Sequence, residues 1–182
     1  MRRHLVEPIR ERREISEIEQ LLASQSERNR MIFIFGINTG LRVSDILALN
    51  VSDVKDRTYV EIIEQKTSKF KKFPLNDKIK RLIAPFVADR DETEPLFCSR
   101  KKNRLDRSQV YRFMNAVCNQ VCTEVNIGTH TMRKTFGYHH YKQFGDVVLL
   151  QNIFNHSSPQ ITLRYIGISQ DEIDKSYLEF EL

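Results

Sequence analysis

Four separated segments of the chain contain residue types suited to attack on a phosphodiester. The residues concerned are Arg42 after a Thr-Gly turn, Lys66, the pair His130 and Arg133, and the pair His156 and Tyr165. A phosphodiester of DNA carries one negative charge and gains more during in-line attack on phosphorus, so two guanidinium groups match it well. We therefore interpret Arg42 and Arg133 as candidate phosphate ligands.

His130 and Arg133 lie three positions apart, which places both side chains on one face of a helix. We expect them in the first turn of that helix, where free backbone N–H groups and the helix dipole also favour an anion. The segment therefore suits a phosphate twice, by its side chains and by its backbone.

Tyr165 is the candidate nucleophile, and it needs activation. A phenol has a pKa of about 10, so roughly one in a thousand is ionised at pH 7. A nearby imidazole can accept its proton, and arginines can stabilise the phenolate. The leaving 5′ oxygen needs a proton in turn, which the ammonium group of Lys66 can deliver. We expect no metal and no other cofactor, since the sequence has no P-loop, no acidic triad and no zinc-type Cys/His spacing.

Each of these residues alone also has a structural interpretation. A lone arginine or lysine is usually a solvated surface residue, and a lone histidine is often a hydrogen-bonded part of the core. Tyr165 can pack in the interior, as we expect for Tyr59, Tyr111 and Tyr141. The chemical interpretation depends on all four segments occurring together.

The elements that must position these residues follow from periodicity. Helical patterning begins near Ser16, which forms a capping-box pattern with Glu19, and Gly40 suits the left-handed end of the second helix. β-branched and aromatic residues predict a hairpin or three-stranded sheet with Lys66 near its turn. The predicted helices span about 16–26, 27–38, 43–49, 77–88, 108–124, 130–144, 147–154 and 159–165, with a last one from 170, and the predicted strands span 58–63 and 69–75. Asp106 or Ser108 is the predicted cap of the helix at 108–124. The fold class is mostly α with a small antiparallel sheet (α+β).

Positive charge is concentrated in two runs. The chain has 182 residues with 29 Lys and Arg against 24 Asp and Glu, a net charge of +5. One such run alone is most simply a solvated face, but two runs flanking candidate catalytic residues favour a polyanion partner. We predict that the polyanion is contacted by Lys69, Lys71, Lys72, Arg100, Lys101, Lys102, Arg104 and Arg107.

Other sequence features limit the class of protein. Three cysteines argue against a disulfide framework, and we expect Cys118 and Cys122 in the core. The longest apolar run, residues 31–37, is too short to cross a bilayer, and the first ten residues do not resemble a signal peptide. We expect a soluble, intracellular protein.

The four segments together resemble the tyrosine recombinases, or phage integrases. NTGLRVSDILAL is similar to the first arginine box of that family, HTMRKTFGYHH to the second, and FNHSSPQITLRYI to the third. Lys66 lies eight residues before Pro74, as the family's hairpin lysine precedes its proline. The first ten or so residues have the pattern of a loose leader, which we place at 1–12. The resemblance implies a catalytic domain over 13–182, including a tail helix at about 170–182, and a cytoplasmic protein of a prokaryotic cell or a phage.

The resemblance also implies a mechanism. Tyr165 would attack the scissile phosphate and form a 3′-phosphotyrosyl link, Arg42 and Arg133 would hold the phosphate, and Lys66 would protonate the leaving oxygen. His130 would act as general acid and base, and His156 would hydrogen-bond the phosphate. Asp45 resembles the acidic residue of the first box, and we interpret it as orienting an arginine. The implied partners are double-stranded DNA and a homotetramer formed on it, from monomers, by exchange of C-terminal helices with Ile173, Tyr177, Leu178 and Phe180 on their apolar face.

Three departures from the family pattern matter. Phe154-Asn155 replaces the usual Leu-Gly before the third-box histidine, and Lys134 replaces the common histidine after Arg133. The chain also leaves no room for the N-terminal core-binding domain of full-length integrases, as in the short fimbrial-switch invertases or a truncated gene. Two alternatives therefore stay open: a catalytically silent DNA-binding remnant or regulator on the same fold, and a type IB topoisomerase.

Overall fold

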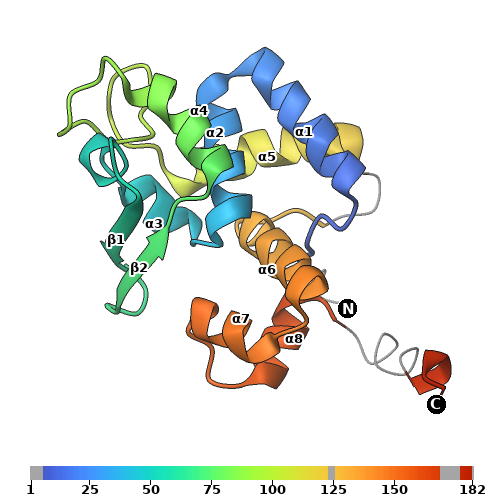
Figure 1. The fold of residues 1–182 in the computed structure, drawn as a ribbon. Coiled ribbons are helices and arrows are strands. Elements are labelled where there is room, and N and C mark those ends of the chain that lie inside the picture. The colour runs from blue at the N-terminus through green and yellow to red at the C-terminus, as the bar shows by residue number, and fades with distance from the viewer. Residues whose placement is uncertain (1–5, 123–125, 169–176, 182) are drawn as a thin grey trace.

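The computed structural model describes residues 6–122, 126–168 and 177–181, and most of this part of the chain is helical (Figure 1). Its helices are α1 (Arg12–Gln25), α2 (Glu27–Thr39), α3 (Val43–Ala48), α4 (Asp77–Val87), α5 (Arg107–Val121), α6 (Thr131–Phe144), α7 (Val147–Phe154) and α8 (Pro159–Ile166), with a 3-10 turn at Val51–Asp53. The strands are β1 (Tyr59–Ile63) and β2 (Phe70–Pro74). The predicted α+β class is confirmed.

Helix α2 is the centre of the larger core. All five residues from Met31 to Phe35 are fully buried, so the helix is apolar around most of its circumference and packs against α1, α4 and α6. Ser26 caps its first turn by accepting from the backbone N–H of Asn29, and Gly40 ends it with φ of 62°. The predicted left-handed end at Gly40 is confirmed, and Arg42 follows two residues after this glycine.

The sheet is one antiparallel hairpin. β1 and β2 pair from Tyr59 opposite Pro74 to Ile63 opposite Phe70, and the turn between them carries Lys66. The hairpin lies on the left of Figure 1, on the same side as α7. The described residues add no third strand to it, so of the two forms predicted from the sequence the hairpin is the one observed.

A second, smaller core joins the last three helices. Leu150, Phe154 and Ile166 are buried against one another, and Gly137 of α6 lets α7 and α8 approach closely. A Cβ atom at Gly137 would meet Phe154 and Ile166 side-chain atoms at 2.7 Å, closer than real Cβ atoms come. Helix α6 packs against α2 as well as α7 and α8, so it connects the two cores (Figure 1).

The N-terminal part differs from the sequence prediction in two ways. Helix α1 begins at Arg12 after Glu11, so Ser16 lies inside the helix and the predicted capping box there is wrong. Ile9, predicted to lie in a loose leader, is fully buried; its N–H donates to Thr135 Oγ1 at 2.9 Å and its carbonyl contacts His139 Nε2 at 3.0 Å. This tertiary contact with α6 holds the segment before α1.

Two predictions near the C-terminal half are confirmed and one lies outside the described residues. Asp106, one of the two residues predicted to cap α5, forms a capping box with Gln109, and Cys118 and Cys122 are buried free thiols. The predicted tail helix from residue 170 falls mostly on residues that the structure does not describe. Within it, Tyr177, Leu178 and Phe180 are described and are exposed.

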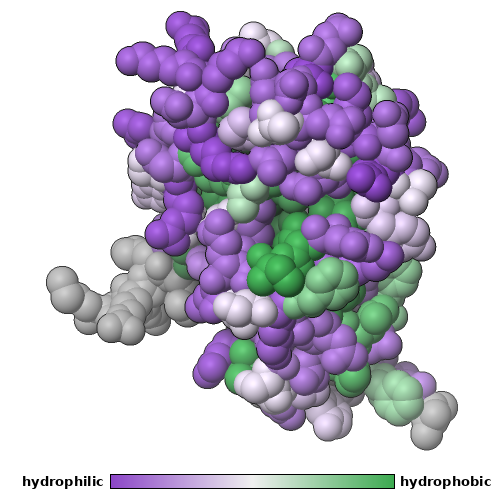
Figure 2. Space-filling model, turned by 90° about the vertical axis from the view of Figure 1, so that its left-hand side faces the viewer, coloured by the Kyte–Doolittle hydropathy of each residue, from purple (hydrophilic) through white to green (hydrophobic). Residues whose placement is uncertain are grey.

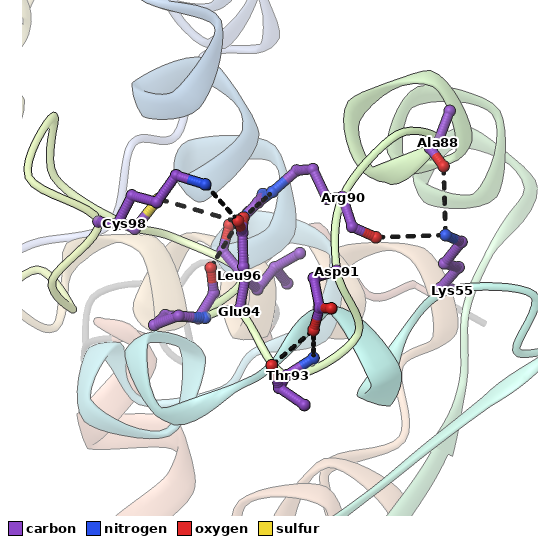
Figure 3. Close-up of polar contacts among 10 residues, drawn as sticks. Lys55, Ala88, Arg90, Asp91, Thr93, Glu94, Leu96 and Cys98 are labelled. Carbon is purple, nitrogen blue, oxygen red and sulfur yellow. Dashed lines mark hydrogen bonds and ion pairs between the residues drawn. The ribbon is translucent and has the colours of Figure 1, made fainter.

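The connection between α4 and α5 is ordered by one arginine. Arg90 donates to the carbonyl oxygens of Leu96 at 2.8 Å and Pro95 at 2.6 Å and forms an ion pair with Glu94 at 3.2 Å. Lys55 donates to the carbonyl oxygen of Arg90 at 3.3 Å, which ties the connection to the start of the hairpin (Figure 3). The acidic residues of this loop are therefore partly neutralised within the loop itself.

Candidate active site

A groove of about 870 Å³ is lined by three of the predicted catalytic residues. Arg42 enters it from the start of α3, Lys66 from the hairpin turn and His130 from the N-terminal end of α6, and Arg104 and Arg107 line it as well. The face of the molecule that carries the hairpin is mostly hydrophilic, with hydrophobic atoms exposed near its middle (Figure 2). The groove therefore combines an open shape with positive charge, as a polyanion site requires.

The tyrosine lies next to this groove. The Tyr165 hydroxyl is 3.1 Å from His130 Nδ1, and the His156 ring lies edge-on to the Tyr165 ring at a centroid distance of 5.0 Å. His130 directly precedes α6 and Tyr165 is near the end of α8, so the contact depends on the packing of α8 against α6. The geometry suits proton transfer between phenol and imidazole.

Arg133 lies beneath the tyrosine and is 2% exposed. It donates to the carbonyl oxygen of Gly40 and, at 3.0 Å, to that of Phe154, and its guanidinium group stacks 4.2 Å from the Phe154 ring centroid. These carbonyls end α2 and α7, so one side chain connects the first and third boxes. The sequence spacing predicted an Arg133 in the first turn of a helix, and it is the third residue of α6.

Burial and positive charge act together on the titratable groups. Burial raises the pKa of Tyr165, while the charges of Arg133 and Arg42 oppose that rise. Burial lowers the pKa of His130, and Arg133 and Lys66 lower it further. Burial also lowers the pKa of His156, to about 4, with Arg133 and Arg42 contributing. At neutral pH both imidazoles are therefore uncharged and able to accept a proton.

His156 is oriented by α8. Its Nδ1 lies 3.1 Å from the Thr162 hydroxyl, and that hydroxyl is 3.3 Å from the Ser158 carbonyl oxygen, to which it can donate. Thr162 is fully buried one turn before Tyr165. The nucleophile and the second histidine are therefore fixed by the same helix.

Arg42 is held by two buried carboxylates. Its Nη1 lies 3.0 Å from Glu64 Oε1 and 3.8 Å from Asp45 Oδ2. Asp45 Oδ1 also accepts from the backbone N–H of Gln65 at 2.9 Å, next to Lys66. This agrees with the interpretation of Asp45 as an orienting residue, and it joins the first box to the hairpin turn.

Sequence reasoning missed Glu64, although a signal for it existed. The β1 side chains alternate between the two faces of the hairpin, and Val60 and Ile62 face inward. If this alternation continues by one more step of two residues, Glu64 also faces inward. Its carboxylate is fully buried and accepts from Thr67 Oγ1 at 2.6 Å and from Asn155 Nδ2 at 3.4 Å. The predicted strand ends at residue 63, as the observed one does, so the alternation was not extended to Glu64.

Lys71 departs from the basic run to which the sequence assigns it. It faces inward from β2 and its Nζ donates to the Ile153 carbonyl oxygen at 2.7 Å. Burial lowers the pKa of Lys71 to about 8, and the charge of Arg133 lowers it further against the opposing charge of Glu64. Lys71 is therefore a link between the hairpin and α7, unlike the exposed lysines with which the sequence groups it.

The other predicted DNA-contacting residues fall into two groups: those that line a groove or are exposed, and those whose charge is paired within the protein. Lys69 lines a second groove with Asn155 and His156, and Arg107 lines the first. Lys72 pairs with Glu61 and Lys102 with Glu94, while Arg100 and Lys101 are exposed. Arg104 donates to the carbonyl oxygens of residues 47–49 at the end of α3, so its guanidinium group also has a structural task.

Both departures from the family boxes lie at the site. Asn155 has φ of 54°, the left-handed conformation that the usual glycine adopts freely, so the tight turn is kept. Lys134 Nζ lies 4.9 Å from the Tyr165 ring centroid, and burial lowers its pKa. The cation therefore faces the ring of the candidate nucleophile.

Over residues 6–122, 126–168 and 177–181, no three His, Cys, Asp or Glu side chains are grouped so that they could bind a metal ion. No helix among the described residues is long and apolar enough to cross a membrane.

Comparison with known proteins gives the family. The Phage integrase family model matches residues 11–172. The probable integrase/recombinase YoeC of Bacillus subtilis (strain 168) is 43% identical over 178 residues, covering 97% of this chain and 98% of that protein. The tyrosine recombinase XerC of Pelobacter propionicus is 28% identical over 153 residues, covering 82% of this chain but 51% of that protein.

Solved structures show the same fold at low identity. The XerA recombinase structure has a TM-score of 0.77 at 19% identity, covering 98% of this chain and 65% of that one. The catalytic domain of bacteriophage HP1 integrase has a TM-score of 0.66 at 20% identity and is covered over 95% of its length. With a family model spanning most of its length and a full-length relative above 40% identity, this chain belongs to the phage integrase family.

Proposed function

We propose that this protein is a site-specific DNA recombinase that cuts and rejoins strands through a 3′-phosphotyrosyl intermediate. The observation that carries the proposal is the contact between the Tyr165 hydroxyl and His130 Nδ1 at 3.1 Å beside a buried arginine. The full-length similarity to a probable integrase/recombinase supports it.

The proposed reaction balances within the site. Tyr165 Oη attacks phosphorus, its proton passes to neutral His130, and the bond from phosphorus to the 5′ oxygen breaks. Lys66 protonates that oxygen, giving a free 5′-hydroxyl group. Arg42, Arg133 and His156 stabilise the charge that develops on the non-bridging oxygens.

Rejoining is the same exchange in reverse. A 5′-hydroxyl group of a second strand attacks the phosphotyrosyl link and restores a phosphodiester and Tyr165. One phosphoester bond replaces another at each step, so we propose that the reaction needs neither ATP nor a metal ion. The residues named above supply the charge and the protons.

The proposed partners are double-stranded DNA and further copies of this chain. Structures with this fold include XerH bound to a difH substrate and a lambda integrase tetramer bound to a Holliday junction. We propose a cytoplasmic protein that is monomeric when free and tetrameric on DNA, joined by C-terminal segments whose exposed Tyr177, Leu178 and Phe180 suit an apolar contact. Light scattering with and without the DNA site tests this assembly.

A trapping experiment tests the proposed chemistry. DNA sites are enriched from randomised duplexes by binding, and a nick is placed close to the cleavage position so that the short 5′-hydroxyl fragment diffuses away. We expect a covalent protein–DNA adduct that resists denaturant, and none with Tyr165→Phe.

The outcomes separate the alternatives. Binding without any adduct, in the native protein, would show a DNA-binding regulator on this fold and contradict the proposal. Relaxation of every supercoiled plasmid without site preference would indicate a type IB topoisomerase.

A further inference from the structure

The Glu64 carboxylate contacts three of the four catalytic segments. It pairs with Arg42 of the first box at 3.0 Å, accepts from Thr67 of the hairpin turn at 2.6 Å, and accepts from Asn155 of the third box at 3.4 Å. No part of its side chain reaches solvent. It therefore lies behind the site, on the side away from an approaching phosphate.

A buried carboxylate is costly unless it is paired and hydrogen-bonded. Burial acts to raise the pKa of Glu64, but the hydrogen bond from Thr67 and the charge of Arg42 outweigh it, and the pKa is lowered. Glu64 is therefore ionised at neutral pH, so its contact with Arg42 is an ion pair and its hydrogen bonds from Thr67 and Asn155 are charge-assisted.

The backbone of Glu64 also closes the turn that carries Lys66. Its N–H donates to the Lys69 carbonyl oxygen at 2.9 Å, and its carbonyl oxygen accepts from the Ser68 N–H at 2.8 Å. The side chain then fixes Thr67, the residue directly after Lys66. The position of the Lys66 side chain in the groove depends on this doubly fixed turn.

Asn155 connects the same carboxylate to the third box. A glycine adopts φ of 54° without strain, but it has no side chain to donate to Glu64. The asparagine keeps the turn before His156 and adds the hydrogen bond. The departure from the family pattern therefore gives this chain a cross-connection between the hairpin and α7.

We propose that Glu64 is a positioning residue that holds the Lys66 turn against Arg42 and the Asn155 turn, so that Lys66 can protonate the leaving 5′ oxygen. The inference rests on the proposed recombinase function and deepens it. Glu64 contacts no DNA itself, and it acts through the residues that do.

The test uses two leaving groups. Glu64→Gln keeps an oxygen for Thr67 and Asn155 but removes the charge. With an ordinary nicked substrate at saturating DNA, we expect adduct formation about 10²-fold slower than in the native protein. With a bridging sulfur at the 5′ position, whose thiolate leaves without a proton because thiols are far more acidic than alcohols, we expect the native rate to be largely recovered.

Matched variants define the comparison. Lys66→Ala should show the same loss and the same recovery with sulfur, and Glu61→Gln, an exposed carboxylate on β1, should react at the native rate on both substrates. Binding affinity, from fluorescence anisotropy, should change only a few-fold in Glu64→Gln. Asn155→Gly should give a few-fold loss with oxygen and none with sulfur, which keeps the test open if Glu64→Gln does not fold.

Two results would overturn the inference. One is a native rate for Glu64→Gln on the oxygen substrate. The other is a loss in Glu64→Gln that sulfur does not relieve while it relieves Lys66→Ala. A native protein that forms no adduct on either substrate would instead refute the proposed function.

Discussion

At the residue scale, the positive charge of the site disfavours the protonated form of its two histidines. Arg42 and Arg133 lie close enough to lower the pKa of His156 and His130, adding to the effect of burial. A site built to bind an anion therefore keeps its imidazoles neutral. That state suits acceptance of the Tyr165 proton, which a charged imidazole cannot perform.

The depressed pKa of His156 predicts how stability depends on pH. The folded value is about 4 and the unfolded value about 6.5, so between them the unfolded chain binds more protons. The contribution of His156 is fully present above about pH 6.5 and is lost as the pH falls toward 4. Denaturant unfolding at pH 7 and at pH 4.5 should show a smaller acid loss for His156→Asn than for the native protein. Equal losses in the two proteins would contradict the prediction.

At the element scale, α3 is a short helix whose two ends are held by different contacts. Arg42 directly precedes it and pairs with Glu64 and Asp45, while Arg104 donates to the carbonyl oxygens at its C-terminal end. A six-residue helix is not stable alone, so these contacts and the buried apolar residues hold it. Arg104 therefore supports the element that presents Arg42.

Replacement of Arg104 distinguishes this structural role from a phosphate contact. Arg104 Nη1 reaches three carbonyls and Nη2 donates to Asn50 Oδ1. Arg104→Lys keeps the charge but loses this two-nitrogen fork, so we expect a loss of about 1–3 kcal/mol in the free energy of unfolding. Arg107→Lys, in the same groove, should leave stability within about 0.5 kcal/mol. Thermal and urea denaturation measure both. If Arg104→Lys is as stable as the native protein, Arg104 has no structural role at α3 and only a phosphate contact is left for it.

The sequence predicted elements well where local signals decide them. The hairpin, the end of α2 at Gly40 and the cap of α5 at Asp106 all follow from residue preferences and spacing. The start of α1 was missed because Glu11 makes no side-chain cap and a tertiary contact at Ile9 fixes the chain before it. Lys71 was grouped with exposed lysines because its burial depends on how the hairpin packs against α7, and a local pattern does not contain that. Glu64 was missed because the inward alternation of β1 was not continued past residue 63.

At the scale of the whole molecule, the site lies where two cores meet. Arg42 and Lys66 come from the larger core and His156 and Tyr165 from the smaller one, while α6 contributes His130 and Arg133 between them. Arg133 donates to a carbonyl of each side, Gly40 and Phe154. The motifs could be read from the sequence in order, but their convergence depends on this packing.

The whole surface also sets how binding responds to salt. If about six phosphates are neutralised, affinity for DNA should fall by roughly 10³-fold between 50 and 200 mM salt, because bound counterions are released on association.

Lys69→Ala and Arg107→Ala each remove a groove cation and should lower the slope of log affinity against log salt by about one. Lys71→Met removes a lysine whose Nζ donates to the Ile153 carbonyl oxygen, so the slope should stay at the native value. Fluorescence anisotropy across the salt series measures all four proteins. A slope near zero for the native protein would refute the basic groove as the DNA surface, and a reduced slope for Lys71→Met would return that residue to the basic run.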